Sequence, residues 1–425
     1  LEEYYLMQKL ARGFGTENID FRLDHANLSP GSSMDSSITL SEIESVDHAL
    51  ILSSYTRLEQ PMINHRIRKA VINGATVNTI NSKKFDFNFK TKIDLLASPQ
   101  TLLPALQSIL KSLYLKTKAD LPEQLSKVNF SDEHDKIADD LIASENGVIV
   151  LGEHLKSNPS NSVIISTVSQ IAQISNSKIA NLTLSGNAHS AEKVGFIPTN
   201  QGMNAGSMLT ESSKAFLLMD VDSEYDFYNP KLAMDLFNKD DVFVVSLTSF
   251  ENQSTLLSAD VILPMASFYE TSGTHINFDG IAQSFSASVK SPGDSKPGWK
   301  IIKVMADLLK LEGFNFVDSS QVAEKALLSS KAQTNISGVS AETFEDSDIT
   351  TLWQYAPYAI DNVTRRAKAL QESNIGKINS AYIAKSTAKK LSLSQDDLYL
   401  GVPVSISDDV AEDCVFVHTS QARRV

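Results

Sequence analysis

Apolar and polar residues alternate along the first 250 residues in blocks that predict strands and helices in turn. Short continuous apolar runs predict buried strands, and apolar residues at a spacing of three or four predict the helices between them. We expect strands at residues 47–55, 75–80, 147–151, 180–184, 214–219 and 242–247. We expect helices from Pro61 to about Asn73, at 133–144, at 161–174 and from about Pro230. This alternation predicts an α/β fold of doubly wound, largely parallel sheets, because strands buried on both faces read as continuous apolar runs.

The second half of the chain changes character. Residues 261–263 read as another buried strand, stopped by Pro264, and residues 299–311 read as an amphipathic helix. Residues 329–350 are rich in Ser, Thr and Asp, whereas 384–425 combine a short helix with short apolar runs. We therefore expect a first α/β region at 1–145, a second at 146–328, a linker or irregular helical segment at 329–383, and a small β-rich domain at 384–425, with truncation of that domain as an open alternative.

Composition excludes several classes of protein. The net charge of −13, from 38 basic and 51 acidic residues, provides no broad basic field for nucleic acid. No segment approaches the roughly 18 apolar residues that a membrane helix needs, so we expect no direct membrane insertion. Cys414 is the only cysteine, which excludes a disulfide framework and Cys-ligated zinc or iron–sulfur sites within this chain. The chain opens without Met, and we expect it to be a fragment of a longer protein.

The segment that follows the predicted strand at 261–263 is the strongest candidate for chemistry. It contains Gly273, Thr274, Asn277 and Gly280 at close spacing. Glycines past the carboxyl end of a strand let backbone approach a ligand, and Thr and Asn side chains can hydrogen-bond it. The alternative, which we favour, is that these residues only close turns against the sheet.

Residues 259–283 resemble the signature of the molybdopterin oxidoreductase superfamily, with Ile281 at the position of the signature's arginine. Further segments, at residues 5–20, 50–61, 193–198, 214–220 and 292–302, resemble the same superfamily in the same order. They are most similar to the version found in the large iron–sulfur subunit of NADH-quinone oxidoreductase, respiratory complex I. The resemblance runs from about residue 4 to about residue 312. It implies the sheet architecture of the formate dehydrogenase and DMSO reductase type.

The resemblance also implies where a cofactor would be held. Gly273, Thr274, Asn277 and Gly280 would form a relic pterin crevice, and Ile281 cannot bind pyrophosphate or pterin oxygens as an arginine does. Where true molybdopterin enzymes place residues that meet the guanine nucleotide, this chain has residues 81–84, including Lys83 and Lys84. These lysines would either neutralise a phosphate or, as we favour, face water at a strand end. Asp24 aligns with the metal-ligand position, and we favour a solvated loop residue there.

We therefore expect the C-terminal part of the large iron–sulfur subunit of a bacterial NADH-quinone oxidoreductase. The fragment would be a scaffold with no cofactor and no catalytic site of its own, and the iron–sulfur clusters would lie in the missing N-terminal part. Its partners would be other peripheral-arm subunits, on the cytoplasmic, inner face of the membrane. The alternative is an active molybdenum or tungsten bis-pterin oxidoreductase, related to formate dehydrogenase or nitrate reductase, with Asp24 as metal ligand. A third possibility, an NAD-binding α/β enzyme, has no support from the glycine pattern.

Overall fold

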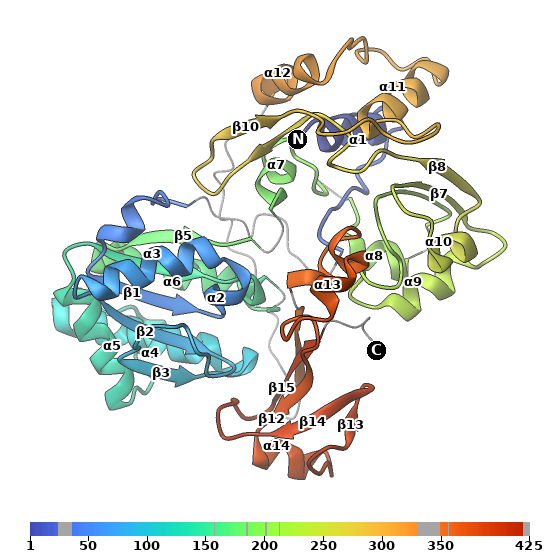
Figure 1. The fold of residues 1–425 in the computed structure, drawn as a ribbon. Coiled ribbons are helices and arrows are strands. Elements are labelled where there is room, and N and C mark those ends of the chain that lie inside the picture. Colours follow the sequence, from blue (N-terminus) through green and yellow to red (C-terminus); the bar gives the residue numbers. More distant parts are fainter. Residues whose placement is uncertain are drawn as a thin grey trace.

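The computed structural model describes residues 1–23, 36–156, 158–183, 186–199, 202–211, 213–329, 349–355 and 357–419. Their strands form two parallel sheets, a mixed C-terminal sheet and a two-stranded ribbon (Figure 1). Asp24 lies outside the described residues. No helix in the described part of the chain is long and apolar enough to span a bilayer.

The first sheet has the strand order β3-β2-β1-β4-β5, with every pair parallel. Its strands are β1 (His48–Leu52), β2 (Thr76–Asn81), β3 (Ile93–Leu96), β4 (Gly147–Leu151) and β5 (Lys178–Asn181). Leu50 and Leu52 face a core formed with α4 (Pro99–Thr117), α5 (Asp132–Ala143) and α6 (Asn161–Ser175). Ala49 and Ile51 face the opposite core, with α3 (Pro61–Ile72). Burial on both faces confirms the doubly wound prediction and explains the continuous apolar runs.

The second sheet consists of β6 (Ala215–Met219), β7 (Phe243–Thr248) and β8 (Val261–Pro264), all parallel. Leu218 and Val244 pack with α9 (Pro230–Phe237) on one face. On the other face, Leu247 packs with apolar residues of α1 (Glu2–Gly13), α11 (Gly298–Leu308) and α12 (Ser319–Ser329). Shorter helices of this unit are α7 (Ala188–Lys193), α8 (Ala205–Thr210) and α10 (Gln253–Ser258), and its ribbon is β9 (Gly273–Ile276) with β10 (Ala282–Phe285).

The C-terminal sheet has the order β11-β15-β12-β14-β13 and mixes parallel and antiparallel pairs. Its strands are β11 (Thr350–Tyr355), β12 (Asn379–Ile383), β13 (Leu398–Tyr399), β14 (Val402–Ile406) and β15 (Cys414–Thr419). Helices α13 (Lys368–Gln371) and α14 (Lys385–Lys390) belong to the same region. The remaining short helices are α2 (Thr56–Glu59), η1 (Glu42–Ser45), η2 (Glu123–Leu125), η3 (Glu153–Leu155), η4 (Pro357–Ala359) and η5 (Thr364–Arg366).

The structure corrects three expectations about these elements. The limit at 145/146 divides the first sheet, because β4 pairs with β1 and β5 pairs with β4. The limit at 383/384 divides the C-terminal sheet, because β11 and β12 precede it. The strand at 261–263 is not buried: Val261 is 38% exposed, and β8 pairs with one neighbour at the edge of its sheet. An apolar run alone does not reveal whether a strand is central or at an edge.

The ends of β1 and β4 approach so closely that only glycine fits at position 152. A methyl group added at Gly152 would lie 2.1 Å from the Ser53 carbonyl oxygen and 2.5 Å from Ser54 Cβ. The Gly152 N–H donates to the Leu52 carbonyl oxygen at 2.9 Å, which extends the parallel ladder past β4. In this strand order β1 and β4 flank the switch point, where doubly wound sheets open their ligand crevice. Here the backbone fills that point.

We expect Gly152→Ala to lower the free energy of unfolding by about 2–3 kcal/mol, because both atoms nearest to the added methyl are held in place. Gly186→Ala is the matched control, since no atom lies within 4 Å of a methyl group at that position. Urea unfolding of both variants and the parent chain measures the difference. Equal midpoints for the two variants would contradict the close packing of the strand ends.

Candidate functional site

The carboxyl ends of the first sheet, where the fold would hold a ligand, are covered by the C-terminal region. The Lys84 N–H donates to the Asp409 carbonyl oxygen at 2.8 Å, and the Ala411 N–H donates to the Ser82 carbonyl oxygen at 2.8 Å. Between these bonds, Lys83 and Val410 form an isolated antiparallel bridge. The segment after β2 is therefore bound through its backbone to the loop before β15.

Side chains of the C-terminal sheet also contact the carboxyl ends of the first sheet. The Phe416 ring lies 5.5 Å from that of Phe85 and 5.8 Å from that of His154, measured between centroids. Gln354 Nε2 donates to Glu59 Oε1 at 2.8 Å, and Ser54 Oγ donates to Glu59 Oε2 at 2.7 Å. The Glu59 carboxylate, whose side chain is 6% exposed, thus has partners from both parts of the chain.

The two lysines at this end are engaged within the protein. Lys83 Nζ lies 4.6 Å from the centre of the Tyr382 ring and 5.5 Å from that of Phe85. Burial lowers the pKa of Lys83, against the attraction of Asp409. Lys84 Nζ lies 3.9 Å from an oxygen of Asp94. These contacts correct the expectation that Lys83 points freely into water, whereas the Lys84 side chain is 55% exposed.

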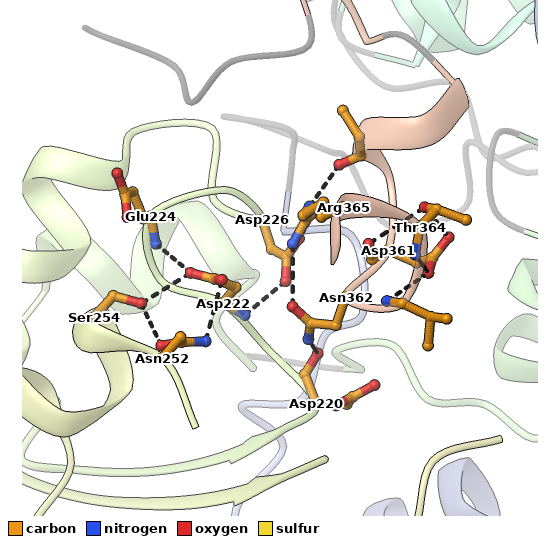
Figure 2. A network of polar contacts seen from close by, with 12 residues as sticks. Asp220, Asp222, Glu224, Asp226, Asn252, Ser254, Asp361, Asn362, Thr364 and Arg365 are labelled. Atoms are coloured by element: carbon orange, nitrogen blue, oxygen red, sulfur yellow. Dashed lines mark hydrogen bonds and ion pairs between the residues drawn. The ribbon is translucent and has the colours of Figure 1, made fainter. Parts of the chain in front are cut away.

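The carboxyl ends of β6 and β7 are occupied by a second segment of the C-terminal region, residues 357–371, which we call the insert (Figure 2). Asn362 Nδ2 donates to the carbonyl oxygen of Asp220, directly after β6, at 3.1 Å. Arg365 forms an ion pair with Asp226 and donates through Nε to the Ala359 carbonyl oxygen at 2.6 Å. The insert therefore binds to the loop in which a doubly wound sheet would contact a ligand.

A buried carboxylate organises the loop beneath the insert. Asp222 accepts hydrogen bonds from Ser254 Oγ at 2.9 Å and from Asn252 Nδ2 at 3.1 Å (Figure 2). The Asp222 N–H donates to Asp226 Oδ2 at 2.7 Å, which connects this network to the ion pair with Arg365. Burial raises the pKa of Asp226, and the Arg365 guanidinium beside it opposes the rise. The loop's polar groups are paired with one another and with the insert.

A cavity of about 280 Å³ remains between α1, the end of β6, the ribbon and the start of α11. Its carboxylates are Glu2, Glu3, Asp20 and Asp220, and its aromatic rings belong to Tyr4, Phe21, Phe196, Phe268, Phe285 and Trp299. Asp20 is paired with Arg22 at 2.7 Å. Burial raises the pKa of Glu3; Glu2 and Asp220 add to the rise, and the Trp299 N–H opposes it. Among the described residues that line this cavity, none is a lysine or an arginine that could bind a phosphate.

The structure brings only two of the four predicted crevice residues to this cavity, Gly273 and Thr274. Asn277 closes the ribbon turn, where its Oδ1 accepts the N–H groups of Ile281 at 2.9 Å and of Asp279 at 3.0 Å. Gly280 has φ +76° in the same turn, a conformation that favours glycine. Ile281 is 57% exposed. The turn geometry supports our favoured interpretation for Asn277 and Gly280, and pterin binding by Gly273 or Thr274 stays a prediction.

Sequence reasoning missed the insert and the loop before β15. The only local signal is a turn in which Asp361 Oδ1 accepts the N–H groups of Val363 and Thr364, both at 2.9 Å. That pattern predicts a turn, and it carries no information about a partner 142 residues away such as Asp220. In the described residues, no group of three or more His, Cys, Asp or Glu side chains is placed to hold a metal ion.

Two relatives of this chain are subunits of NADH-oxidising complexes. It is 26% identical over 291 residues to "NADH dehydrogenase [ubiquinone] iron-sulfur protein 1, mitochondrial" of Solanum tuberosum. The aligned region covers 67% of this chain and 33% of the relative. It is 22% identical over 294 residues to the NADH-ubiquinone oxidoreductase 75 kDa subunit of Reclinomonas americana. This aligned region covers 69% of this chain and 36% of the relative. The chain thus spans about a third of the length of these relatives.

A third relative belongs to a different class of enzyme. The F420-dependent formate dehydrogenase 1 subunit alpha of Methanococcus maripaludis is 33% identical over 94 residues, which is 22% of this chain and 13% of the relative. Among solved structures, acetylene hydratase from Pelobacter acetylenicus superimposes with a TM-score of 0.67 at 12% identity. That match covers 97% of this chain and 74% of the hydratase, and it shows a shared fold.

The family model described as molybdopterin oxidoreductase matches residues 1–308, from α1 to the end of α11. The match includes both parallel sheets and the ribbon with its Gly273 and Gly280. It covers well over half of the chain. The chain therefore belongs to the molybdopterin oxidoreductase family.

Proposed function

We propose that this chain is the molybdopterin-oxidoreductase-like part of the large iron–sulfur subunit of an NADH-quinone oxidoreductase, and that it serves there as a structural domain without a cofactor. One observation carries the second half of the proposal. The chain's own C-terminal region contacts the carboxyl ends of both parallel sheets, through the loop before β15 after β2 and through the insert after β6. A ligand at either place would have to displace these contacts.

The relatives support the first half. The matches to the Solanum tuberosum and Reclinomonas americana subunits extend over two thirds of this chain, and both names refer to NADH-oxidising complexes. Because this chain spans a third of their length, we place the iron–sulfur clusters in the rest of the subunit. Its single cysteine agrees with that placement, since iron–sulfur clusters are held mainly by several thiolates.

The residues present do not fit a pterin dinucleotide. The phosphates of such a ligand need cationic or N–H partners, whereas the cavity beside Gly273 is lined by Glu2, Glu3 and Asp220. Ile281 contributes an apolar side chain where the family signature has arginine. Lys83 lies against two aromatic rings instead of facing a ligand. The proposal therefore assigns no cofactor chemistry to this domain.

By the same proposal, the partners are the other peripheral-arm subunits, and the protein lies on the cytoplasmic face of a bacterial membrane, held there by the complex. A domain of this kind would serve through its stable apolar core and through the surface that it offers to neighbouring subunits. The doubly wound core is stabilised by apolar contacts on both faces of its sheets, and these contacts do not involve a ligand.

The second candidate is an active molybdenum or tungsten bis-pterin oxidoreductase. The 33% identity with a formate dehydrogenase subunit over 94 residues is the observation that favours it. Under this candidate Asp24 would be the metal ligand, and Asp24 lies outside the described residues. The insert would then have to leave the carboxyl ends of β6 and β7 when the cofactor binds.

Metal and pterin analysis separates the two candidates. We expect the chain, and the full subunit purified from its own organism, to contain no stoichiometric molybdenum or tungsten by mass spectrometry. We also expect acid denaturation to release no fluorescent pterin. A formate dehydrogenase treated in parallel is the positive control for recovery. One metal and two pterins per full subunit would reject the structural proposal in favour of the bis-pterin enzyme.

We expect Arg365→Gln to lower the free energy of unfolding by about 2–3 kcal/mol at pH 7, because it leaves the Asp226 carboxylate without its cation. Loss of one partner of a fully buried pair costs roughly 3–5 kcal/mol, and here the Arg365 and Asp226 side chains are 10% and 20% exposed. The pKa of Asp226 is raised in the folded protein, so folding favours its protonated form. The deficit should therefore shrink as the pH falls toward about 4.

Urea unfolding between pH 4 and pH 8 provides this measurement. Arg366→Gln is the matched control, because Arg366 is exposed and has no carboxylate partner in the described residues. Arg366 lies over the Phe250 ring at 4.4 Å and, like Arg365, donates a hydrogen bond to Asn362. Its cost should stay below about 1 kcal/mol at every pH. Equal costs for the two variants, or a deficit at Arg365 that does not change with pH, would contradict the role of the ion pair in holding the insert.

A further inference from the structure

The β9–β10 ribbon has two edges of different character. The Asn277 N–H donates to the Ile281 carbonyl oxygen at 3.1 Å, which fixes this pair as hydrogen-bonded across the ribbon. Because bonded and non-bonded pairs alternate in an antiparallel ladder, the pairs Ile276–Ala282 and Thr274–Ser284 direct their backbone groups outward. Each edge therefore presents N–H and C=O groups from two residues.

The outward groups of β9 have partners within the protein. The Thr274 N–H donates to Glu2 Oε2 at 3.0 Å, and the Ile276 N–H donates to Ser190 Oγ at 2.9 Å. The Thr274 carbonyl oxygen accepts from the Leu1 backbone nitrogen at 3.0 Å. Glu2, Ser190 and Leu1 thus close this edge against α1 and α7.

The outward edge of β10 is open. Residues 281–284 are all exposed, and in the part of the chain that the structure describes no hydrogen bond involves the N–H of Ala282 or Ser284. No charged residue and no proline occurs from residue 280 to residue 289. Natural sheets protect free edges with charges, prolines, bulges or a covering element. This edge carries neither a charge nor a proline, and its protection against pairing with another chain is its short length of four residues.

The ribbon is also held in place from its far end. The Leu40 N–H donates to Asp279 Oδ1 in the turn at 2.7 Å, and Phe278 packs against the core that lies between the first sheet and α3. Phe285 lies 5.0 Å from the His275 ring across the ribbon, edge to face. The open edge is therefore preformed, so little conformational entropy is lost when a strand adds to it.

We propose that β10 binds an extended, uncharged segment of a neighbouring subunit, which adds to the ribbon as a third strand. The proposal rests on the proposed function, because it needs an assembly in which that subunit is already held near. A four-residue edge of about 13 Å buries far less than the roughly 1,200 Å² that a stable separate interface needs. This argues against a second copy of the chain as the partner. The absence of charge along the edge selects a segment without Asp, Glu, Lys or Arg over the paired residues.

The test uses the full subunit in its assembled complex, with a photo-crosslinking amino acid at Ile281, next to the open edge. We expect a cross-link to one extended segment of one neighbouring subunit, identified by peptide mass spectrometry. Ser284→Pro removes an outward N–H without touching the bonds inside the ribbon, and it should reduce the cross-link at least tenfold. Ser284→Ala, which keeps the N–H and loses only the hydroxyl contact with Thr274, is the matched control and should keep the cross-link.

Hydrogen exchange of the backbone amides is an independent test of strand addition at β10. The Ser284 amide should exchange at least tenfold more slowly in the complex than in the isolated chain, whereas the inward Gln283 amide should be protected in both. Ala282→Pro removes the other outward N–H and repeats the test if Ser284→Pro does not fold. A cross-link to a second copy, or equal cross-links in Ser284→Pro and Ser284→Ala, overturns the inference alone. Failure of the unaltered subunit to assemble with neighbours overturns the proposed function, and the inference with it.

Discussion

The structure depends on one requirement: polar groups at the carboxyl ends of parallel strands must have partners when they are taken out of water. In a ligand-binding member of such a fold, the ligand supplies many of those partners. In this protein the chain supplies them. Backbone bonds from Asp409 and Ala411 satisfy the segment after β2, and Asn362 and Arg365 satisfy the loop after β6. Our proposal that the domain has no cofactor follows from this substitution of chain for ligand.

The same contacts explain how the parts of the molecule are joined. Both covering segments belong to residues 349–419, so the C-terminal region contacts the first unit through Gln354 and Phe416 and the second through the insert. Figure 1 shows α13 beside α8 of the second unit, with β15, β12 and β14 of the C-terminal sheet below it. The ribbon turn adds a direct bond between the units at Asp279. Loosening one strand end would therefore weaken the attachment of the whole C-terminal region.

Much of the fold could be predicted from the sequence, because local periodicity reflects burial. The strand at 147–151 has the predicted limits, since five consecutive residues are buried on both faces of a sheet. The helix α4 escaped prediction, and it contains Pro104 within its length, a residue that usually ends helices. The site was less predictable. Asp226 and Arg365 are 139 residues apart, and nothing in either local sequence indicates the other.

The family signature at residues 259–283 contains residues that the fold requires. It also contains one position, Ile281, that the fold does not require. Asn277 binds two N–H groups of its own turn, and Gly280 has a positive φ. These residues are needed for the ribbon turn whether or not a ligand binds. Ile281 is exposed, and its side chain is free to differ without cost to the fold. A signature of this kind therefore persists where folding demands it and changes where only a ligand did, so it identifies the family more securely than the activity.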